Sequence, residues 1–422
     1  MTSPEDMPGD PDDARALDAA PAAVEVASAG IAERELVPLA AMTISLVALS
    51  IDAMLPALAD IGRELAVGRT NDSQLVVGVF FLGLAFGQML FGPASDSLGR
   101  RPAIHAGFAI FLAGSLLTMW AGDFTALLAG RLLQGIGSAG PRTVMMAVVR
   151  DLFEGRAMAR ILSLVMTVFI VVPALAPALG QGVMLVSGWR TIFVALFGYA
   201  LVCWVWFALR LPETLRPERR APLTLARIGR AIRETVTTPV AAAYTFAGGL
   251  VFGAFVGYLS SAPQIFEDIY GLGHLFPAAF AACALSLGLA SFVNARLVGR
   301  FGMRLLSRRA LEVLTLWSFG FLLVVWGFSG VPPLWLLFAY MLPAFFMIGV
   351  LFGNFNALAM EPLGHIAGVA AAVIASLTTL ASTLIGGAIG QAFDGTVVPL
   401  VGGFGLLGLA SLVVVHLGDR RA

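Results

Sequence analysis

The sequence predicts an all-α integral membrane protein with twelve transmembrane helices in two six-helix bundles. Three observations lead to this fold class. The 422 residues are 59% hydrophobic and only 12% charged, with a mean hydropathy of +0.89. A soluble chain of this length needs about twice that share of charged residues to cover its surface. The apolar residues also fall into successive long stretches, and one motif is echoed about half a chain length later.

Each apolar stretch is long enough to cross a bilayer. An α-helix rises about 1.5 Å per residue, so roughly 20 apolar residues span about 30 Å of hydrocarbon. In chain order the expected helices are 36–58, 74–94, 103–121, 125–149, 159–184, 190–210, 240–262, 276–298, 308–329, 333–357, 367–392 and 396–417. Because their number is even, both termini are expected on one side of the membrane.

The polar segments divide the chain into five parts. Residues 1–35 are acidic and rich in Ala and Pro without an apolar period, which is typical of a disordered tail. The two bundles are expected at 36–210 and 240–417, with a cytoplasmic linker at 211–239 and a short tail at 418–422. The linker carries six arginines and forms either an interfacial helix that only fixes the topology or a regulatory element.

The arginines indicate which side faces the cytoplasm. The tails and the loops after even-numbered helices hold sixteen arginines, whereas the loops after odd-numbered helices hold only Arg63 and Arg69. Short loops rich in arginine remain in the cytoplasm. We therefore expect a multi-pass membrane protein with both termini in the cytoplasm.

The two halves of the chain echo one another. Gly99-Arg-Arg follows the second expected helix, and Gly302, in a segment with three arginines, follows the eighth. A repeat of about half the chain length favours duplicated bundles related by an axis along the membrane normal.

Charged residues inside apolar stretches are the first candidates for function, because each costs about 2.5–3.5 kcal/mol to insert unless it is paired or hydrated. Asp52 in helix 1 and Arg131 in helix 4 lie at similar depth, and we expect them to pair. Arg142 follows Arg131 by eleven residues, about three helical turns, and so projects from nearly the same face. This stripe is expected to face an aqueous cavity between the halves.

Asp52 is expected to bind the coupling ion, a proton. Burial of a carboxyl favours its protonated form and a nearby arginine favours its ionised form, so opening the site to either side changes both effects. Two other interpretations stay open. In the first, Asp52 and Arg131 form a static pair that only packs two helices together. In the second, Arg142 only extends toward the cytoplasmic surface.

The second half contributes bulk and polarity rather than charge. Tyr258 in helix 7 and Asn354 in helix 10 represent a set of side chains expected to line an amphipathic pocket for a small molecule. The other members are Tyr244, Phe252, Phe255, Met341, Phe345, Met347 and Asn356. The alternative is ordinary packing against lipid or neighbouring helices.

Helix 5 contains Pro173, Pro177 and Gly180 within its apolar stretch. Proline removes intrahelical hydrogen bonds, and glycine permits close helix contact. We expect a kinked, tightly packed helix that acts as a hinge and seal, or that forms only a packing notch.

Several function classes are excluded by the composition. Twenty-six basic and twenty-six acidic residues cancel, so no overall field attracts nucleic acid. The four histidines are scattered and both cysteines lie in apolar runs, so we expect no metal, no cofactor and no enzyme. A monomer in the lipid bilayer with a small-molecule substrate is expected, and a receptor or structural protein without transport is the alternative from another class.

The segment after helix 2 resembles the signature of the major facilitator superfamily, in which a Gly is followed by an Asp and then by Gly-Arg-Arg. Gly92, Asp96, Gly99, Arg100 and Arg101 match it. The resemblance implies a cytoplasmic gate between the halves. Its glycines allow a tight turn and close approach, and its Asp accepts hydrogen bonds from Arg or from a helix N-terminus of the other half.

Further motifs resemble drug:proton antiporters of the Bcr/CflA type, named for bicyclomycin and chloramphenicol resistance. They lie, in chain order, at 50–59, 131–137, 173–180, 189–190, 212–214 and 357–368. The resemblance runs from about residue 36 to 417. It departs from the superfamily pattern in the second half of the chain, where Gly299 stands at the position that corresponds to Asp96 in the first half. It implies proton-coupled efflux of small amphipathic drugs or metabolites across the bacterial inner membrane. Proton-coupled import of a metabolite is the alternative.

Overall fold

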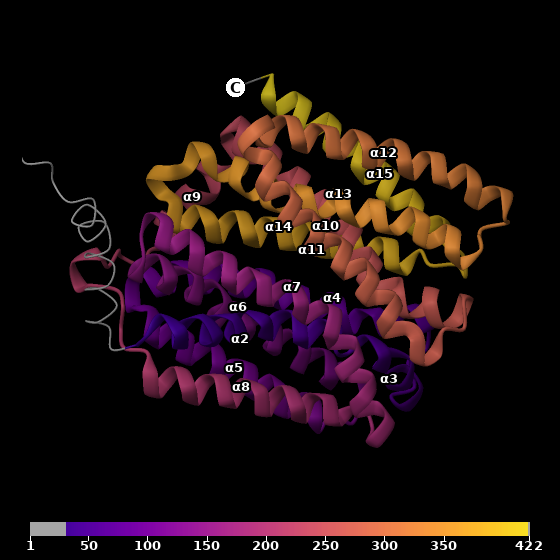
Figure 1. The fold of residues 1–422 in the computed structure, drawn as a ribbon. Helices are drawn as coiled ribbons and strands as arrows, with labels where there is room; N and C mark the ends of the chain where they lie inside the picture. Colours follow the sequence, from indigo (N-terminus) through magenta and orange to yellow (C-terminus); the bar gives the residue numbers. More distant parts are fainter. Residues whose placement is uncertain (1–30, 421–422) are drawn as a thin grey trace, which may run out of the picture.

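The computed structural model describes residues 31–420, without the side chains of residues 159, 169 and 170. The predicted tails therefore lie mostly outside the described residues. Within the described part, twelve long helices form two groups of six, which confirms the predicted fold class (Figure 1).

The bounds of these helices follow the expected stretches closely. The first bundle contains α2 (Glu33–Asp52), α4 (Leu75–Leu98), α5 (Arg100–Met119), α6 (Phe124–Leu152), α7 (Gly155–Val186) and α8 (Arg190–Arg210). The second contains α10 (Pro239–Pro263), α11 (Phe276–Phe301), α12 (Met303–Gly327), α13 (Leu334–Met360), α14 (Ala367–Gln391) and α15 (Val398–Asp419). Shorter elements are η1 (Leu55–Ala57), α3 (Leu58–Glu64), η2 (Thr70–Gln74), η3 (Pro217–Arg219), α9 (Leu225–Thr237), the π-helix η4 (Gln264–Ile269), η5 (Gly273–Leu275) and η6 (Glu361–Ile366).

The first helix begins inside the segment expected to be a tail. Glu35 lies in the first turn of α2, and its carboxylate accepts hydrogen bonds from Arg210 of α8 at 2.6 and 2.7 Å. Trp206 also donates to it. These contacts order residues whose acidic composition alone suggested disorder.

The expected helix 36–58 is interrupted in the structure. α2 ends at Asp52, and the chain passes through a turn and η1 before α3 continues to Glu64. Pro56 stands in the first turn of η1, where its missing N–H group costs nothing. Asp52 therefore lies at a discontinuity inside a membrane-spanning segment, where ligand sites of transporters are typically built.

Glycines allow three helices of the first bundle to pack tightly. A Cβ added to Gly135 of α6 would lie 2.1 Å from the carbonyl oxygen of Phe80 in α4. A Cβ added to Gly137 would lie 2.3 Å from the backbone nitrogen of Phe111 in α5. Both distances are too short for any side chain, so α4, α5 and α6 are in close backbone contact at these points.

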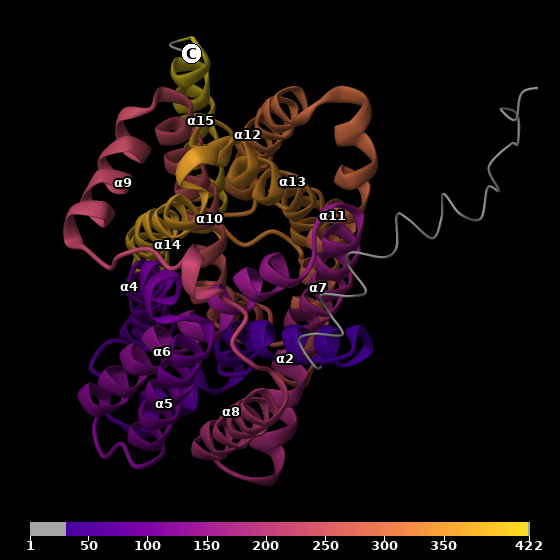
Figure 2. The ribbon, with the colours of Figure 1, turned by 90° about the vertical axis from the view of Figure 1, so that its left-hand side faces the viewer.

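Two helix pairs join the bundles, α4 with α14 and α7 with α11 (Figure 2). The α4–α14 pair includes polar contacts along its length. Ser376 donates to the carbonyl oxygen of Ala85 at 2.8 Å, and Thr379 donates to Gln88 at 3.1 Å.

The amphipathic helix α9 follows the first bundle and lies against α14 (Figure 1). Its buried residue Ala231 forms a small apolar cluster with Val369 and Val373 of α14. His365 of η6 contacts the carboxylate of Glu234 on α9. The segment after α8 thus packs on the second bundle through an amphipathic helix.

Candidate functional site

A cavity of about 190 Å³ lies between the bundles. The first bundle contributes Val47, Ala48, Ile51, Asp52, Phe81, Arg142 and Pro173 to its lining. The second contributes Phe252, Phe255, Tyr258, Leu259, Phe280, Ala284, Leu287, Phe345 and Phe352. The structure therefore brings together three predicted substrate-binding residues, Asp52, Arg142 and Tyr258, from three different helices.

Seven of the sixteen residues that line the cavity are aromatic. Phe81 of α4 lies edge-on to Phe252 of α10, with ring centroids 5.8 Å apart, so the rings bridge the two bundles. Phe252 stacks on Phe255 at 5.7 Å. Tyr258 lies edge-on to Phe345 at 4.7 Å. Such a wall is apolar and polarisable, and it suits flat, apolar ligand bodies.

Asp52 is the one acidic residue in the cavity lining. Its side chain is 4% exposed, and no described residue donates a hydrogen bond to its carboxyl or pairs with it. An ionisable group inside a membrane protein without a protein partner indicates a functional site, because a bare buried charge is costly. A proton, water or a ligand has to supply the missing partner.

Arg142 projects into the same cavity from α6 and is half-buried. It follows Pro141, whose ring lies against Gly107 of α5: a Cβ added there would be 2.5 Å from the proline Cδ. Among the described residues no carboxylate or carbonyl binds the Arg142 guanidinium. The cavity therefore holds one acidic and one basic side chain that are not paired with each other.

Arg131 occupies a different environment from the one expected. It is fully buried, it donates to the carbonyl oxygen of Val76 and to Gln134, each at 3.0 Å, and its guanidinium lies 4.5 Å from the ring centroid of Phe80. The predicted ion pair with Asp52 is wrong for this structure. Although Arg131 shares a helix face with Arg142, at its depth α6 is enclosed by α4.

Asn354 also lies outside the cavity lining. It forms a reciprocal amide pair with Asn294 of α11, at 2.8 and 3.1 Å. The face of α13 that carries Asn354 is therefore directed toward α11, and this polar pair joins two helices of the same bundle. A single sequence does not reveal which neighbour a helix face will meet.

The Gly-Asp-Gly-Arg-Arg motif forms a compact turn between α4 and α5. Gly99 adopts φ +112°, a conformation that favours glycine. Arg100 donates to Asp96 at 2.6 Å and to Asp151 of α6 at 2.8 Å. Asp96 also faces the first turn of α14 in the other bundle, where a Cβ added to Gly368 would lie 3.0 Å from its carboxylate. Asp96 thus accepts from an arginine of its own bundle and lies beside the first turn of α14 in the other bundle.

Glu213 belongs to the 212–214 motif, but its contact with this turn was not predicted from the sequence. Its carboxylate accepts hydrogen bonds from the backbone nitrogens of Arg100 at 2.8 Å and Arg101 at 3.0 Å, and thus binds the N-terminus of α5. Asp151 was not predicted. It lies in the last turn of α6, whereas Glu213 follows the end of α8, and both acids are on the arginine-rich side.

The proline-containing helix α7 lines the cavity and also contacts the chain directly after the end of α2. Pro173 lines the cavity, and Pro177 is buried one turn further along. A Cβ added to Gly180 would lie 2.0 Å from the carbonyl oxygen of Ala53, the residue after Asp52. Gly180 thus lets α7 touch the backbone at the discontinuity beside Asp52.

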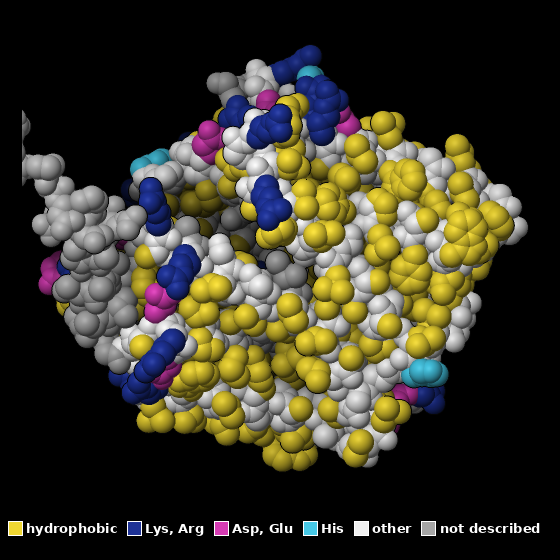
Figure 3. Space-filling model, viewed as in Figure 1, with side chains coloured by type: hydrophobic (Ala, Val, Ile, Leu, Met, Phe, Trp, Pro, Cys, Tyr) yellow, Lys and Arg dark blue, Asp and Glu magenta, His cyan; other side chains and the backbone are white. Residues whose placement is uncertain are grey.

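The two ends of the molecule differ. We call the end with the Gly99 turn, α9 and most of the arginines the arginine-rich end, and the end with α3 and η4 the distal end. Figure 3 shows a hollow between the bundles toward the arginine-rich end. At the distal end, amide side chains join the bundles: Asn71 donates to Phe393 at 2.9 Å, and Gln264 donates to Asn71 at 2.9 Å.

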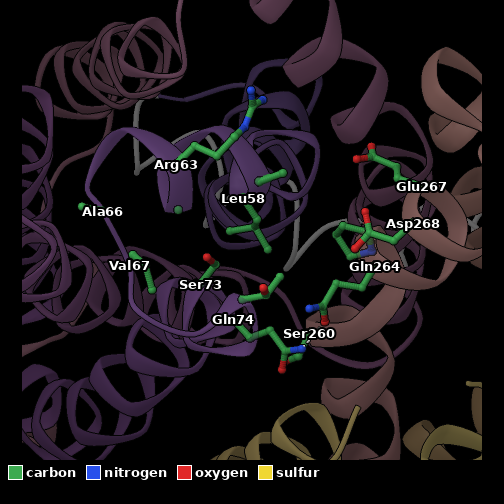
Figure 4. A pocket seen from close by; sticks show the side chains of 14 residues that line it. Leu58, Arg63, Ala66, Val67, Ser73, Gln74, Ser260, Gln264, Glu267 and Asp268 are labelled. Carbon is green, nitrogen blue, oxygen red and sulfur yellow. Dashed lines mark hydrogen bonds between the residues drawn. The ribbon is translucent and has the colours of Figure 1, made fainter. Parts of the chain in front are cut away.

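A second pocket of about 410 Å³ lies at the distal end, on the other side of these amides (Figure 4). Its walls come from both bundles. Arg63, Ser73 and Gln74 line it from the first bundle, and Gln264 and Glu267 line it from the second (Figure 4). Gln74 donates to Gln264 across this boundary. The central cavity and this pocket are thus separated by contacts between the bundles.

Comparison with known proteins identifies the class. Residues 40–390 match the family model of the Major Facilitator Superfamily, and the chain belongs to this family of transporters. It is 30% identical over 349 residues to the uncharacterized MFS-type transporter YdgK of Bacillus subtilis, covering 81% of this chain and 85% of the relative. It is 28% identical over 380 residues to a bicyclomycin resistance protein homolog of Haemophilus influenzae, covering 88% and 92%.

A solved structure supports the fold. The human organic anion transporter MFSD10 superimposes with a TM-score of 0.70 over 92% of this chain and all of its own, at 20% identity. The family is one of transporters, so the expectation that this chain is not an enzyme is confirmed. The protein is a multi-pass membrane transporter with bacterial relatives.

Proposed function

We propose that this transporter exports small amphipathic drugs or metabolites across the bacterial inner membrane in exchange for protons. The observation that carries the proposal is Asp52: one buried, unpaired carboxyl in the lining of a cavity between two bundles. A single acid in that position binds either a proton or a substrate group. Because the proton and the substrate exclude one another at this carboxyl, the inward movement of protons is coupled to the outward movement of substrate.

The proposed cycle follows from the two ends of the molecule. The arginine-rich end faces the cytoplasm, since arginine-rich short loops stay on that side, and both termini are then cytoplasmic. In the present conformation the cavity takes substrate from the cytoplasm while the amides around Asn71 and Gln264 close the distal end. After rearrangement, a proton from outside displaces the substrate from Asp52.

Other residues support this cycle without binding the proton. The turn formed by Gly92, Asp96, Gly99, Arg100 and Arg101 acts as the gate at the cytoplasmic end. Arg131 acts through packing of the first bundle rather than through contact with Asp52. In α7, Pro173, Pro177 and Gly180 form a hinge and seal beside Asp52. The protein acts as a monomer, because one chain supplies every wall of the cavity.

Names of relatives favour export over import. A bicyclomycin resistance protein homolog and the Escherichia coli multidrug resistance protein D both match most of the chain. Resistance to a compound is a natural result of its removal from the cell. Proton-coupled import of a metabolite uses the same cavity and is the second candidate.

The direction of coupling is tested with the purified chain in proteoliposomes of known orientation. A pH gradient that is acidic on the distal side should drive a labelled amphipathic compound toward the distal side against its concentration gradient. Accumulation toward the arginine-rich side under this gradient would instead establish import. No movement beyond that of protein-free liposomes, for any member of a chemically varied panel, would overturn proton-coupled transport.

A further inference from the structure

The central cavity carries two opposite charges that the protein leaves unpaired. Asp52 and Arg142 both line it, on α2 and α6. Neither has a hydrogen-bond or ion-pair partner among the described residues, although charged pairs occur elsewhere in the structure, such as Arg100 with Asp151. Charges in a low-dielectric environment need partners, so this cavity is electrostatically incomplete without a ligand or water.

The space between the two charges is walled by aromatic rings. Phe81, Phe252, Phe255 and Phe345 form a network of edge-on and stacked contacts around it. A cavity of about 150 Å³ is sufficient for benzene. The volume of about 190 Å³ therefore suits a compact molecule of one or two rings.

We propose that the cavity takes small aromatic zwitterions, with a basic group bound to Asp52 and an acidic group bound to Arg142. This inference rests on the proposed function and names its substrate class. A purely cationic ligand is attracted by Asp52 but repelled by Arg142. A purely anionic ligand is attracted by Arg142 but repelled by Asp52. A zwitterion satisfies both charges and places its ring against the aromatic wall.

The hydroxyl of Tyr258 gives an additional binding point. The side chain is 1% exposed, lines the cavity, and its hydroxyl has no oxygen or nitrogen partner among the described residues. A polar ring substituent of the substrate provides a hydrogen-bond partner for it. The basic group of the substrate binds the carboxyl of Asp52, which also binds the proton. Substrate and proton therefore exclude one another at this residue, as antiport requires.

The test uses four matched compounds: 4-(2-aminoethyl)benzoic acid, its methyl ester, its N-acetyl derivative and the doubly blocked molecule. These are a zwitterion, a cation, an anion and a neutral compound with the same ring. Equilibrium binding of each tritiated compound is measured with the wild-type chain in nanodiscs at neutral pH. The zwitterion should bind roughly tenfold or more tightly than each of the others, since hydrogen bonds to charged groups are the strong ones.

Two variants assign the charges, and one serves as control. Asp52→Asn should weaken the zwitterion and the cation but not the anion, whereas Arg142→Gln should weaken the zwitterion and the anion but not the cation. Glu312→Gln, an acid of α12 outside the cavity, should change none of them. Equal binding of all four compounds to the wild type would overturn the proposal, and this comparison needs no variant.

Failure of the charge preference is distinguishable from failure of the proposed function. If neutral compounds are exported against a proton gradient while the four compounds bind equally, proton-coupled export stands and the zwitterion assignment is wrong. If the zwitterion binds with the expected preference but no compound moves in response to the pH gradient, the binding assignment stands and proton coupling is wrong.

Discussion

Gly92 of α4 and Ala372 of α14 touch across the boundary between the two bundles, so closely that a Cβ added to Gly92 would lie 2.3 Å from the Cβ of Ala372. The contact lies one helical turn from Asp96, in the turn at the arginine-rich end. The glycine of the superfamily signature thus has a steric reason here: it lets two helices from different bundles meet.

Replacement of Gly92 should therefore disturb the bundle interface. We expect Gly92→Val to lower the free energy of unfolding by about 1–3 kcal/mol through overpacking, and to slow transport. Gly299→Val is the matched control, since Gly299 lies in α11 with no atom within 4 Å of an added Cβ. Thermal unfolding in detergent and transport in proteoliposomes measure both effects. Equal behaviour of the two variants would contradict this account of the contact.

Glu213 should stabilise the turn between α4 and α5. Glu213→Ala leaves the backbone N–H groups of Arg100 and Arg101 without their carboxylate, at a cost of about 1–3 kcal/mol. We expect a lower melting temperature for this variant than for Glu218→Ala, since Glu218 is an exposed residue of the same segment. If Glu213→Ala melts at the wild-type temperature, the carboxylate does not hold the turn.

The distal amides should set the balance between the two open states. Gln264 donates to Asn71 and accepts from Gln74, so Gln264→Ala removes two links between the bundles. Each is worth about 1 kcal/mol, so the equilibrium should shift by about 2 kcal/mol and the population open at the distal end should rise by roughly thirtyfold.

The distal opening is measured by labelling Ser260→Cys with a membrane-impermeant maleimide. Ser260 lines the distal pocket and is 2% exposed in the present conformation. Labelling should be faster in the Gln264→Ala background. The labelling rate should be unchanged by Asp72→Asn, because the hydrogen bond between Arg69 and Asp72 lies within one segment and does not join the bundles. Unchanged labelling in both backgrounds would show that the amides do not control this opening.

The two arginines of α6 should behave differently. Arg131→Lys loses the contacts with Val76, Gln134 and the ring of Phe80, and we expect a loss of about 1–3 kcal/mol in unfolding free energy. Arg142→Lys keeps a charge in the cavity and should leave the unfolding free energy within about 0.5 kcal/mol of the wild type. Thermal unfolding measures both losses. If Arg142→Lys lost more stability than Arg131→Lys, the assignment of Arg131 to the core and of Arg142 to the cavity would be contradicted.

Helix number and the arginine-rich turn were predictable because they depend on local properties. Twenty consecutive apolar residues span a bilayer wherever they occur, and a Gly-Arg-Arg turn needs only neighbouring residues. The break after Asp52 was not predicted. Pro56 suggests some interruption, but its position depends on how α7 packs against Ala53 through Gly180.

The cavity was predictable only in part, because helix faces meet different surroundings at different depths. Arg131 and Arg142 share one face of α6, yet the first is buried beside α4 and the second lines the cavity. Asn354 and Tyr258 were equally good candidates by composition, but only Tyr258 lines the cavity. Phe81, Phe280 and Phe352 were missed because 30 phenylalanines with similar spacing do not distinguish cavity from lipid.

The central claim is that Asp52 carries the coupled proton. The most direct measurement is proton movement in proteoliposomes containing a pH-sensitive dye, after substrate is added to the side of the arginine-rich end. Wild-type chain should show substrate-dependent proton flux, and Asp52→Asn should insert and fold normally but show none. Substrate-dependent proton flux at the wild-type rate in Asp52→Asn would contradict the account.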